Sequence, residues 1–230
     1  MKITSSSTVS ELLYWSYANL AMAEKAVHDR DQKYSRLHFM IRARLLSGLT
    51  KGTMSPRSLM LDQRIRMKLP QECVYCGSVD HLAIDHIVPT NRGGADTGDN
   101  AIWACRRCNS SKSDRDLFAW WSTYRQDFPP LFVVRIYLKQ AIEYFASRGL
   151  LDTPISEVQE NPFSLATIPK TFPPPESLSF SPFHARKESK KDQQDETGQP
   201  PLAALSATSP VAPTSLPVLT PAPASGGASS

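Results

Sequence analysis

The pattern of apolar and polar positions predicts a helical N-terminal part, a short stretch with strand character and a second helical part. Leu13, Tyr17 and Leu20 recur at the spacing of one helix face. Thr8 and Glu11 stand just before them in the capping-box arrangement, in which each side chain accepts from the other residue's backbone N–H. We therefore expect a helix that begins after Thr8.

Two further helices are expected before residue 70. The second is a separate helix or a prolongation of the first, and it ends near Gly48 or Gly52. A third, short and rich in arginine, runs from Leu59 to Leu69. The apolar positions that predict the second helix are Leu37, Ile41 and Leu45.

The middle of the chain changes from helical to strand character. Residues 82–89 are mostly apolar and β-branched, and residues 100–104 have the pattern of a returning strand. Between them lies a loop, residues 91–99, whose three glycines permit unusual backbone conformations. A helix is expected to open at Cys108 and to extend to about Arg125. The unit predicted here is strand, loop, strand and helix.

A last helix is expected to start at Pro129-Pro130 and to stop at Gly149. Periodicity disappears from about residue 155, and residues 171–230 hold 11 of the 19 prolines. Such a composition is typical of a disordered tail that could tether a protein partner. The apolar stripe of the last helix consists of Val134, Leu138, Ala141, Ile142 and Phe145.

Composition and charge are those of a soluble globular protein, with 40% hydrophobic and 21% charged residues among 230. No apolar run is long enough to span a membrane and no secretory signal is recognisable, so we expect a cytoplasmic protein. Residues 1–69 carry 12 Lys and Arg against 5 Asp and Glu. This basic excess favours a polyanionic partner such as a nucleic acid.

All four cysteines form two C-x-x-C pairs, Cys73 with Cys76 and Cys105 with Cys108, separated by 28 residues. Two such knuckles can supply the four thiolates of a tetrahedral zinc site, whereas a redox dithiol or disulfides are the alternatives. A four-thiolate site has no open position for a substrate. We therefore expect a structural Zn²⁺ that stabilises a segment too short to build its own core.

The expected strand carries Asp85 and His86 within the zinc loop. A histidine with an ordinary pKa near 6.5 can accept a proton from water at neutral pH. Asp85 and Asn109 offer the hard oxygen ligands that Mg²⁺ prefers. Consecutive strand residues point to opposite faces, so a bulge or bend is needed if Asp85 and His86 serve one site.

Each of these residues also has a purely structural interpretation. Asp85 could be a strand-end carboxylate, Asn100 a turn residue, Asn109 a helix cap, and His86 a zinc ligand or a core histidine. Taken together within one zinc loop, however, they favour a catalytic site.

The segment from Cys73 to Asp116 resembles the HNH endonucleases, the ββα-metal nucleases. The resemblance rests on the Asp-His pair with Ile-Val-Pro, the Gly-Gly pair, the middle asparagine and the C-x-x-C-N-x-x-K ending. It implies that His86 is the general base, that Asp85 and Asn109 hold Mg²⁺ or Mn²⁺, and that Asn100 orients His86 or its loop.

The resemblance completes an α+β fold prediction in which a zinc-bound ββα-metal core is flanked by helices. We divide the chain into a basic helical region (1–69), the nuclease domain (70–125), a helix packed on it (126–152), and a linker with a disordered tail (153–230).

The predicted activity is hydrolysis of DNA phosphodiester bonds. RNA would suit the same mechanism, and a non-catalytic zinc-knuckle protein that binds nucleic acid is the alternative from another class. Oligomeric state and target sequence are left open by the sequence. The candidate phosphate contacts are Arg64, Arg66, Lys68, Arg92, Arg106, Arg107 and Lys112.

Overall fold

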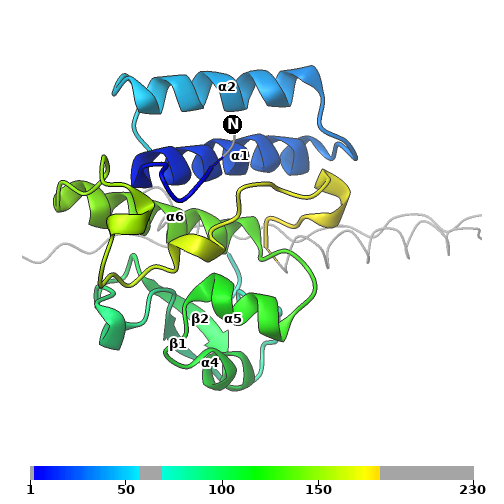
Figure 1. Cartoon of the computed structure of the whole chain (residues 1–230). Coiled ribbons are helices and arrows are strands. Elements are labelled where there is room, and N and C mark those ends of the chain that lie inside the picture. The colour runs from blue at the N-terminus through cyan, green and yellow to red at the C-terminus, as the bar shows by residue number, and fades with distance from the viewer. Residues whose placement is uncertain (1–2, 57–68, 182–230) are drawn as a thin grey trace, which may run out of the picture.

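The computed structural model describes residues 3–56 and 69–181, and it combines helices with one two-stranded sheet. Two helices lie in an upper layer, α6 lies beneath them, and the sheet with two short helices lies on the far side of α6 (Figure 1). The elements are α1 (Val9–Asp29), α2 (Arg36–Thr50), β1 (Leu82–His86), β2 (Ala101–Cys105), α4 (Arg106–Lys112), α5 (Leu117–Tyr124) and α6 (Leu131–Ser147).

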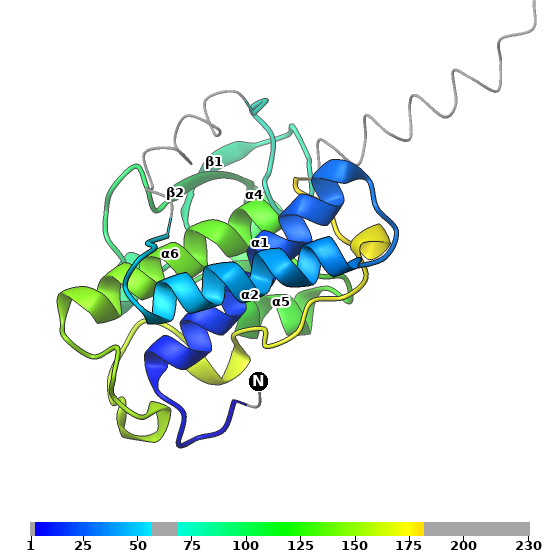
Figure 2. The same ribbon diagram turned by 90° about the horizontal axis from the view of Figure 1, so that it is seen from above.

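The capping box predicted for the first helix is confirmed. The backbone N–H of Glu11 donates to Thr8 Oγ1 over 3.2 Å, and that of Thr8 donates to Glu11 Oε2 over 3.0 Å. Helix α1 ends at Asp29 because Arg30 adopts a left-handed conformation with φ of 59°. α2 is therefore a separate helix that crosses above α1 and α6 (Figure 2). The expected helix from 59 to 69 falls almost wholly outside the described residues.

Strands β1 and β2 pair antiparallel, with Asp85 opposite Ile102 and His86 opposite Ala101. No bulge interrupts this register. β1 instead ends at His86, and the backbone bends at the two residues that follow it. The chain therefore turns from the strand towards the glycine loop through a bend and not through a bulge.

The expectation of one continuous helix from Cys108 to Arg125 was wrong. α4 begins two residues earlier, at Arg106, and it stops at Lys112 because Ser113 has φ of 50°. A new helix starts after Asp116, whose side chain accepts from the backbone N–H groups of Phe118 and Ala119. A side-chain cap inside an apparently continuous pattern therefore divides it into α4 and α5.

Asp116 also connects this small unit to the rest of the fold. It is 2% exposed and accepts from the Tyr137 hydroxyl of α6 and from the backbone N–H of Ser164 over 3.2 Å. The Phe118 and Tyr137 rings meet edge to face at 4.9 Å between centroids. α6 is buried along most of its length, as its apolar stripe predicts, and it forms the centre of the core.

The boundary placed at residue 153 needs correction, because residues 153–181 pack on the helices rather than forming a linker. Phe163, Leu165 and Ile168 of this segment are buried. Its end reaches the first turn of α6, where Leu131 N–H donates to Ser179 O over 2.9 Å and Phe132 N–H to Phe180 O over 3.1 Å. Residues 182–230, which include most of the predicted disordered tail, lie outside the described residues.

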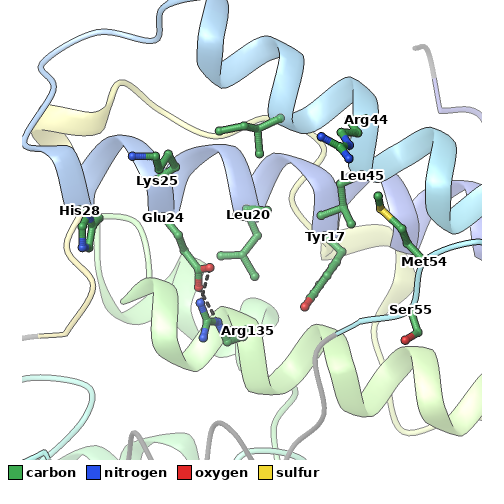
Figure 3. Close-up of a pocket in the computed structure, with 12 residues that line it drawn as sticks. Tyr17, Leu20, Glu24, Lys25, His28, Arg44, Leu45, Met54, Ser55 and Arg135 are labelled. Atoms are coloured by element: carbon green, nitrogen blue, oxygen red, sulfur yellow. Dashed lines mark hydrogen bonds and ion pairs between the residues drawn. The ribbon is translucent and has the colours of Figure 1, made fainter.

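A cavity of about 760 Å³ lies along α1 between α2 and α6. Figure 3 shows the Glu24 carboxylate of α1 paired with the Arg135 guanidinium of α6 in its wall. Arg135 Nε donates to Glu24 Oε1 over 2.6 Å, and Arg135 Nη2 donates to Glu24 Oε2. The pair joins the upper helical layer to α6. Within residues 3–56 and 69–181, no helix has the length and apolar character needed to cross a membrane.

Candidate metal and nuclease site

The four cysteines converge in space as their spacing predicts. Their sulfur atoms all lie within 4.8 Å of one another, and Cys76 Sγ is 3.7 Å from Cys105 Sγ. The first knuckle is a tight turn in which Gly77 N–H donates to Cys73 O over 2.7 Å. Cys105 ends β2 and caps α4, and Cys108 lies one turn into that helix.

This arrangement fits a structural Zn²⁺. A tetrahedron with Zn–S bonds of about 2.3 Å places sulfur atoms about 3.8 Å apart, close to the Cys76–Cys105 separation. The hydrogen bond from Cys108 lowers the pKa of the Cys73 thiol, whereas the same contact, together with burial, raises the pKa of Cys108. Four thiolates this close need a cation to offset their charge, so the donor set suits zinc and leaves no position for substrate.

Asp85 is held in place by two donors. It is 7% exposed; Tyr75 Oη donates to its Oδ2 over 2.7 Å and Lys112 Nζ to its Oδ1 over 3.1 Å. The phenol is fully buried, which raises the pKa of Tyr75 well above its ordinary value, and the Asp85 charge raises it further. A carboxylate has about four lone-pair sites, so both oxygens of Asp85 can still bind a cation.

Lys112 does not lie on the surface, and the prediction that it contacts phosphate is not supported by its position. Its side chain is 0% exposed, and its ammonium donates to His86 O over 2.6 Å as well as to Asp85. Burial lowers the pKa of Lys112, and the Asp85 carboxylate opposes this effect. Lys112 therefore fixes α4 against the end of β1, where Asp85 and His86 stand.

His86 contacts a residue that the sequence analysis did not select. Its Nε2 lies 3.0 Å from Oδ1 of Asp96, in the glycine loop. The two residues are ten positions apart, and no periodic signal connects positions in a loop of this kind. The sequence feature that could have indicated this contact is the glycine loop, because its glycines permit a tight return of the backbone towards the strand.

Asn100 is completely buried and holds the glycine loop closed. Its Oδ1 accepts from Val88 N–H over 2.9 Å, and its Nδ2 donates to Val88 O over 2.7 Å and to Ala95 O over 2.8 Å. Gln140 of α6 donates to the same Oδ1 over 3.1 Å. These contacts are those of a residue that fixes the loop; its effect on catalysis stays a prediction.

Asp85, His86 and Asn109 line one open cavity of about 380 Å³. Asn109 comes from α4, and its Nδ2 donates to Ile84 O over 3.3 Å, so its Oδ1 is the oxygen that is left to accept or to bind a cation. An anionic carboxylate and an amide oxygen are hard donors that fit Mg²⁺ or Mn²⁺. The catalytic role of the three residues stays a prediction, although they are brought together as that prediction requires.

Apart from the buried Lys112, the predicted phosphate contacts divide into two groups. Three of them are exposed, one before the glycine pair and two at the start of α4: Arg92, Arg106 and Arg107. Arg64, Arg66 and Lys68 lie outside the described residues.

The arginines of α2 do not line the cavity of Asp85, His86 and Asn109, because α2 and the sheet lie on opposite sides of the molecule (Figure 1). The Arg42 guanidinium also lies over the Trp15 ring, 4.8 Å from its centroid, and donates to Asn19 Oδ1. The expectation that the basic N-terminal region favours a nucleic-acid partner stays a prediction.

The comparison with protein families identifies this unit. Residues 73–115 match the family described as HNH endonuclease. The chain contains an HNH endonuclease domain. The match spans the two cysteine knuckles, both strands, the glycine loop and α4, and it ends just before Asp116.

Similarity to one curated protein also supports an endonuclease domain. The chain is 38% identical over 53 residues to the CRISPR-associated endonuclease Cas9 of Corynebacterium diphtheriae, and this stretch is 21% of the chain. It covers only 5% of that protein's length, so the similarity concerns a small part of it. No solved structure matches the chain.

Proposed function

We propose that the chain is a metal-dependent HNH endonuclease that hydrolyses phosphodiester bonds in DNA. The observation that carries the proposal is the shared cavity of Asp85, His86 and Asn109 within the HNH domain. A protein that only binds nucleic acid would need the cysteines but not this convergence of a base and two hard oxygen ligands. The proposed setting is the cytoplasm, where reduced cysteines remain available for zinc.

Hydrolysis needs a nucleophilic water, and His86 is the group that can accept its proton. The imidazole is 27% exposed and borders an open cavity, so both water and a phosphodiester can reach it. Asp85 and Asn109 would hold a divalent ion, which when bound supplies charge to the phosphoryl and leaving oxygens.

Tyr75 and Lys112 keep the Asp85 carboxylate in one orientation, as outer hydrogen-bond partners of metal ligands generally do. Lys112 also donates to the carbonyl of His86, so one ammonium fixes both neighbouring residues of the site. The exposed Arg92, Arg106 and Arg107 would contact the phosphate backbone without reading sequence.

The test is incubation of zinc-loaded protein with supercoiled plasmid, with and without Mg²⁺ or Mn²⁺. We expect metal-dependent nicking or cutting that His86→Ala removes, at equal zinc content. His28→Ala is the matched control, because His28 is 84% exposed on α1 and does not line the cavity of Asp85, His86 and Asn109. Plasmid that is bound but never cut, under every metal, would contradict the proposal; cleavage of RNA alone would correct the substrate.

A further inference from the structure

The contact between His86 and Asp96 is made by a loop that is fixed at both of its ends. Gly94 N–H donates to Pro89 O over 3.0 Å, and Asn100 Nδ2 holds the carbonyl of Ala95, next to Asp96. A Cβ on Gly94 would lie 2.1 Å from Val88 O, so only glycine permits this close return of the backbone. The loop therefore carries Asp96 back to the end of β1.

The hydrogen bonds that hold this loop also come from outside the HNH domain. Gln140 of α6 donates to Asn100 Oδ1 over 3.1 Å and to Asp99 O over 3.2 Å. Because α6 contributes many residues to the buried core, the loop that carries Asp96 is hydrogen-bonded to a core helix. The Asp96 side chain itself is 88% exposed. An exposed pair of this kind adds little to stability, so its consequence lies in orientation.

The chemistry of imidazole indicates which ring nitrogen of His86 carries the proton in this contact. A carboxylate only accepts hydrogen bonds, so Asp96 favours the neutral tautomer that has its proton on Nε2. The lone pair is then on Nδ1, and among the described residues Nδ1 of His86 has no hydrogen-bond partner. A general base needs such a lone pair at a fixed ring orientation.

We propose that Asp96 is a positioning residue that holds His86 as the Nε2–H tautomer and leaves Nδ1 to accept the proton of the attacking water. The inference rests on the proposed nuclease function. It assigns no contact between Asp96 and the substrate.

The test compares plasmid cleavage by zinc-loaded Asp96→Ala, Asp96→Asn and wild-type protein in Mg²⁺. Asp96→Ala should lower kcat by roughly 10- to 100-fold with KM unchanged, by analogy with the outer hydrogen-bond partners that orient metal-binding histidines. Asp96→Asn should recover at least several-fold of that loss, because its amide oxygen still accepts from Nε2–H. Asp80→Ala is the control, since Asp80 is an exposed carboxylate of the same domain outside the cavity.

A second readout does not depend on activity. In protein labelled with ¹⁵N-histidine, the His86 ring, assigned from the His86→Ala spectrum, should be the Nε2–H tautomer in wild type and a mixture in Asp96→Ala. The inference fails if wild type shows the Nδ1–H tautomer, if Asp96→Ala cuts as fast as wild type or faster, or if Asp96→Asn is no better than Asp96→Ala. Wild type that cuts nothing while showing the expected tautomer would overturn the proposed function instead.

Discussion

The buried ammonium of Lys112, in α4, donates to the carboxylate of Asp85, in β1, and Asp85 itself lines the candidate site. Charges removed from water are costly unless they are paired and hydrogen-bonded. Here the same ammonium also satisfies the carbonyl of His86, and Tyr75 satisfies the second carboxylate oxygen. The orientation of Asp85 thus depends on α4 staying docked against the sheet.

Lys112→Met should destabilise the protein by about 3–5 kcal/mol, because it leaves the Asp85 charge buried without its counter-charge. The free energy of unfolding of the zinc-loaded protein in urea measures this effect. Lys33→Met is the control, since Lys33 is exposed and its change should stay within about 0.5 kcal/mol. Equal stability of Lys112→Met and wild type would mean that the ammonium is not buried against Asp85.

Zinc removal should unfold the HNH domain, because four cysteine sulfur atoms within 4.8 Å of one another lose the cation that joins the two knuckles. The Tyr75 ring contacts the Trp120 ring edge to face, 4.9 Å between centroids, so near-ultraviolet circular dichroism reports on this packing. We expect about one Zn²⁺ per chain from a tetrahedral four-thiolate site. A strong chelator should reduce the aromatic signal, and added Zn²⁺, but not Mg²⁺, should restore it. An unchanged spectrum after complete zinc loss would contradict the structural role.

The Glu24–Arg135 pair should contribute to the joint between α1 and α6. The two side chains are 16% and 11% exposed, and two parallel hydrogen bonds connect them. Arg135→Met should cost about 3–5 kcal/mol, since it removes the guanidinium that donates both of these hydrogen bonds to a largely buried carboxylate.

A double-mutant cycle with Glu24→Gln measures the coupling between the two side chains, which should be clearly favourable. The comparison is the Lys25–Asp29 pair on the same helix, whose side chains are 42% and 26% exposed. Its coupling should be clearly weaker, as for other exposed pairs one helical turn apart. Equal coupling in the two pairs would mean that burial does not distinguish them.

Local patterns determined much of this fold. The capping box at Thr8 and the apolar stripe of α6 concern neighbours within one helix, so the sequence contained the information needed to predict them. Cysteine spacing likewise predicted the convergence of both knuckles. The pocket shared by Asp85, His86 and Asn109 followed from a strand inside the zinc loop and a helix that carries its last cysteine.

The remaining features depend on contacts between distant segments. Helical spacing places Lys112 on the same face as Asn109, but only the position of β1 decides that this face is buried. Asp96 is brought to His86 by a clamped loop, which has no periodicity to detect. The segment around Phe163 packs through short turns, and those also have no repeating apolar pattern. In each case the missing information was a three-dimensional neighbour.

The stability of the protein at high pH should depend on Tyr34. Its hydroxyl donates to Pro173 O over 2.8 Å, and burial raises its pKa to about 12. An unfolded tyrosine has a pKa of about 10, so the unfolded chain loses this proton first as the pH rises. The stabilisation is complete below about pH 10 and is lost as the pH rises towards about 12.

Tyr34→Phe isolates this contribution, because the phenyl ring keeps the packing but has no proton to lose. Below pH 10 the variant should be less stable than wild type by about 1 kcal/mol, the usual contribution of one hydrogen bond. Thermal unfolding between pH 9 and 12 should show wild type falling more steeply than Tyr34→Phe, so that the two curves converge. Tyr75 and Tyr137, whose pKa values are also raised by burial, remain in both proteins and produce the slope that they share. Parallel curves across this range would show that Tyr34 is not buried against the segment around Pro173.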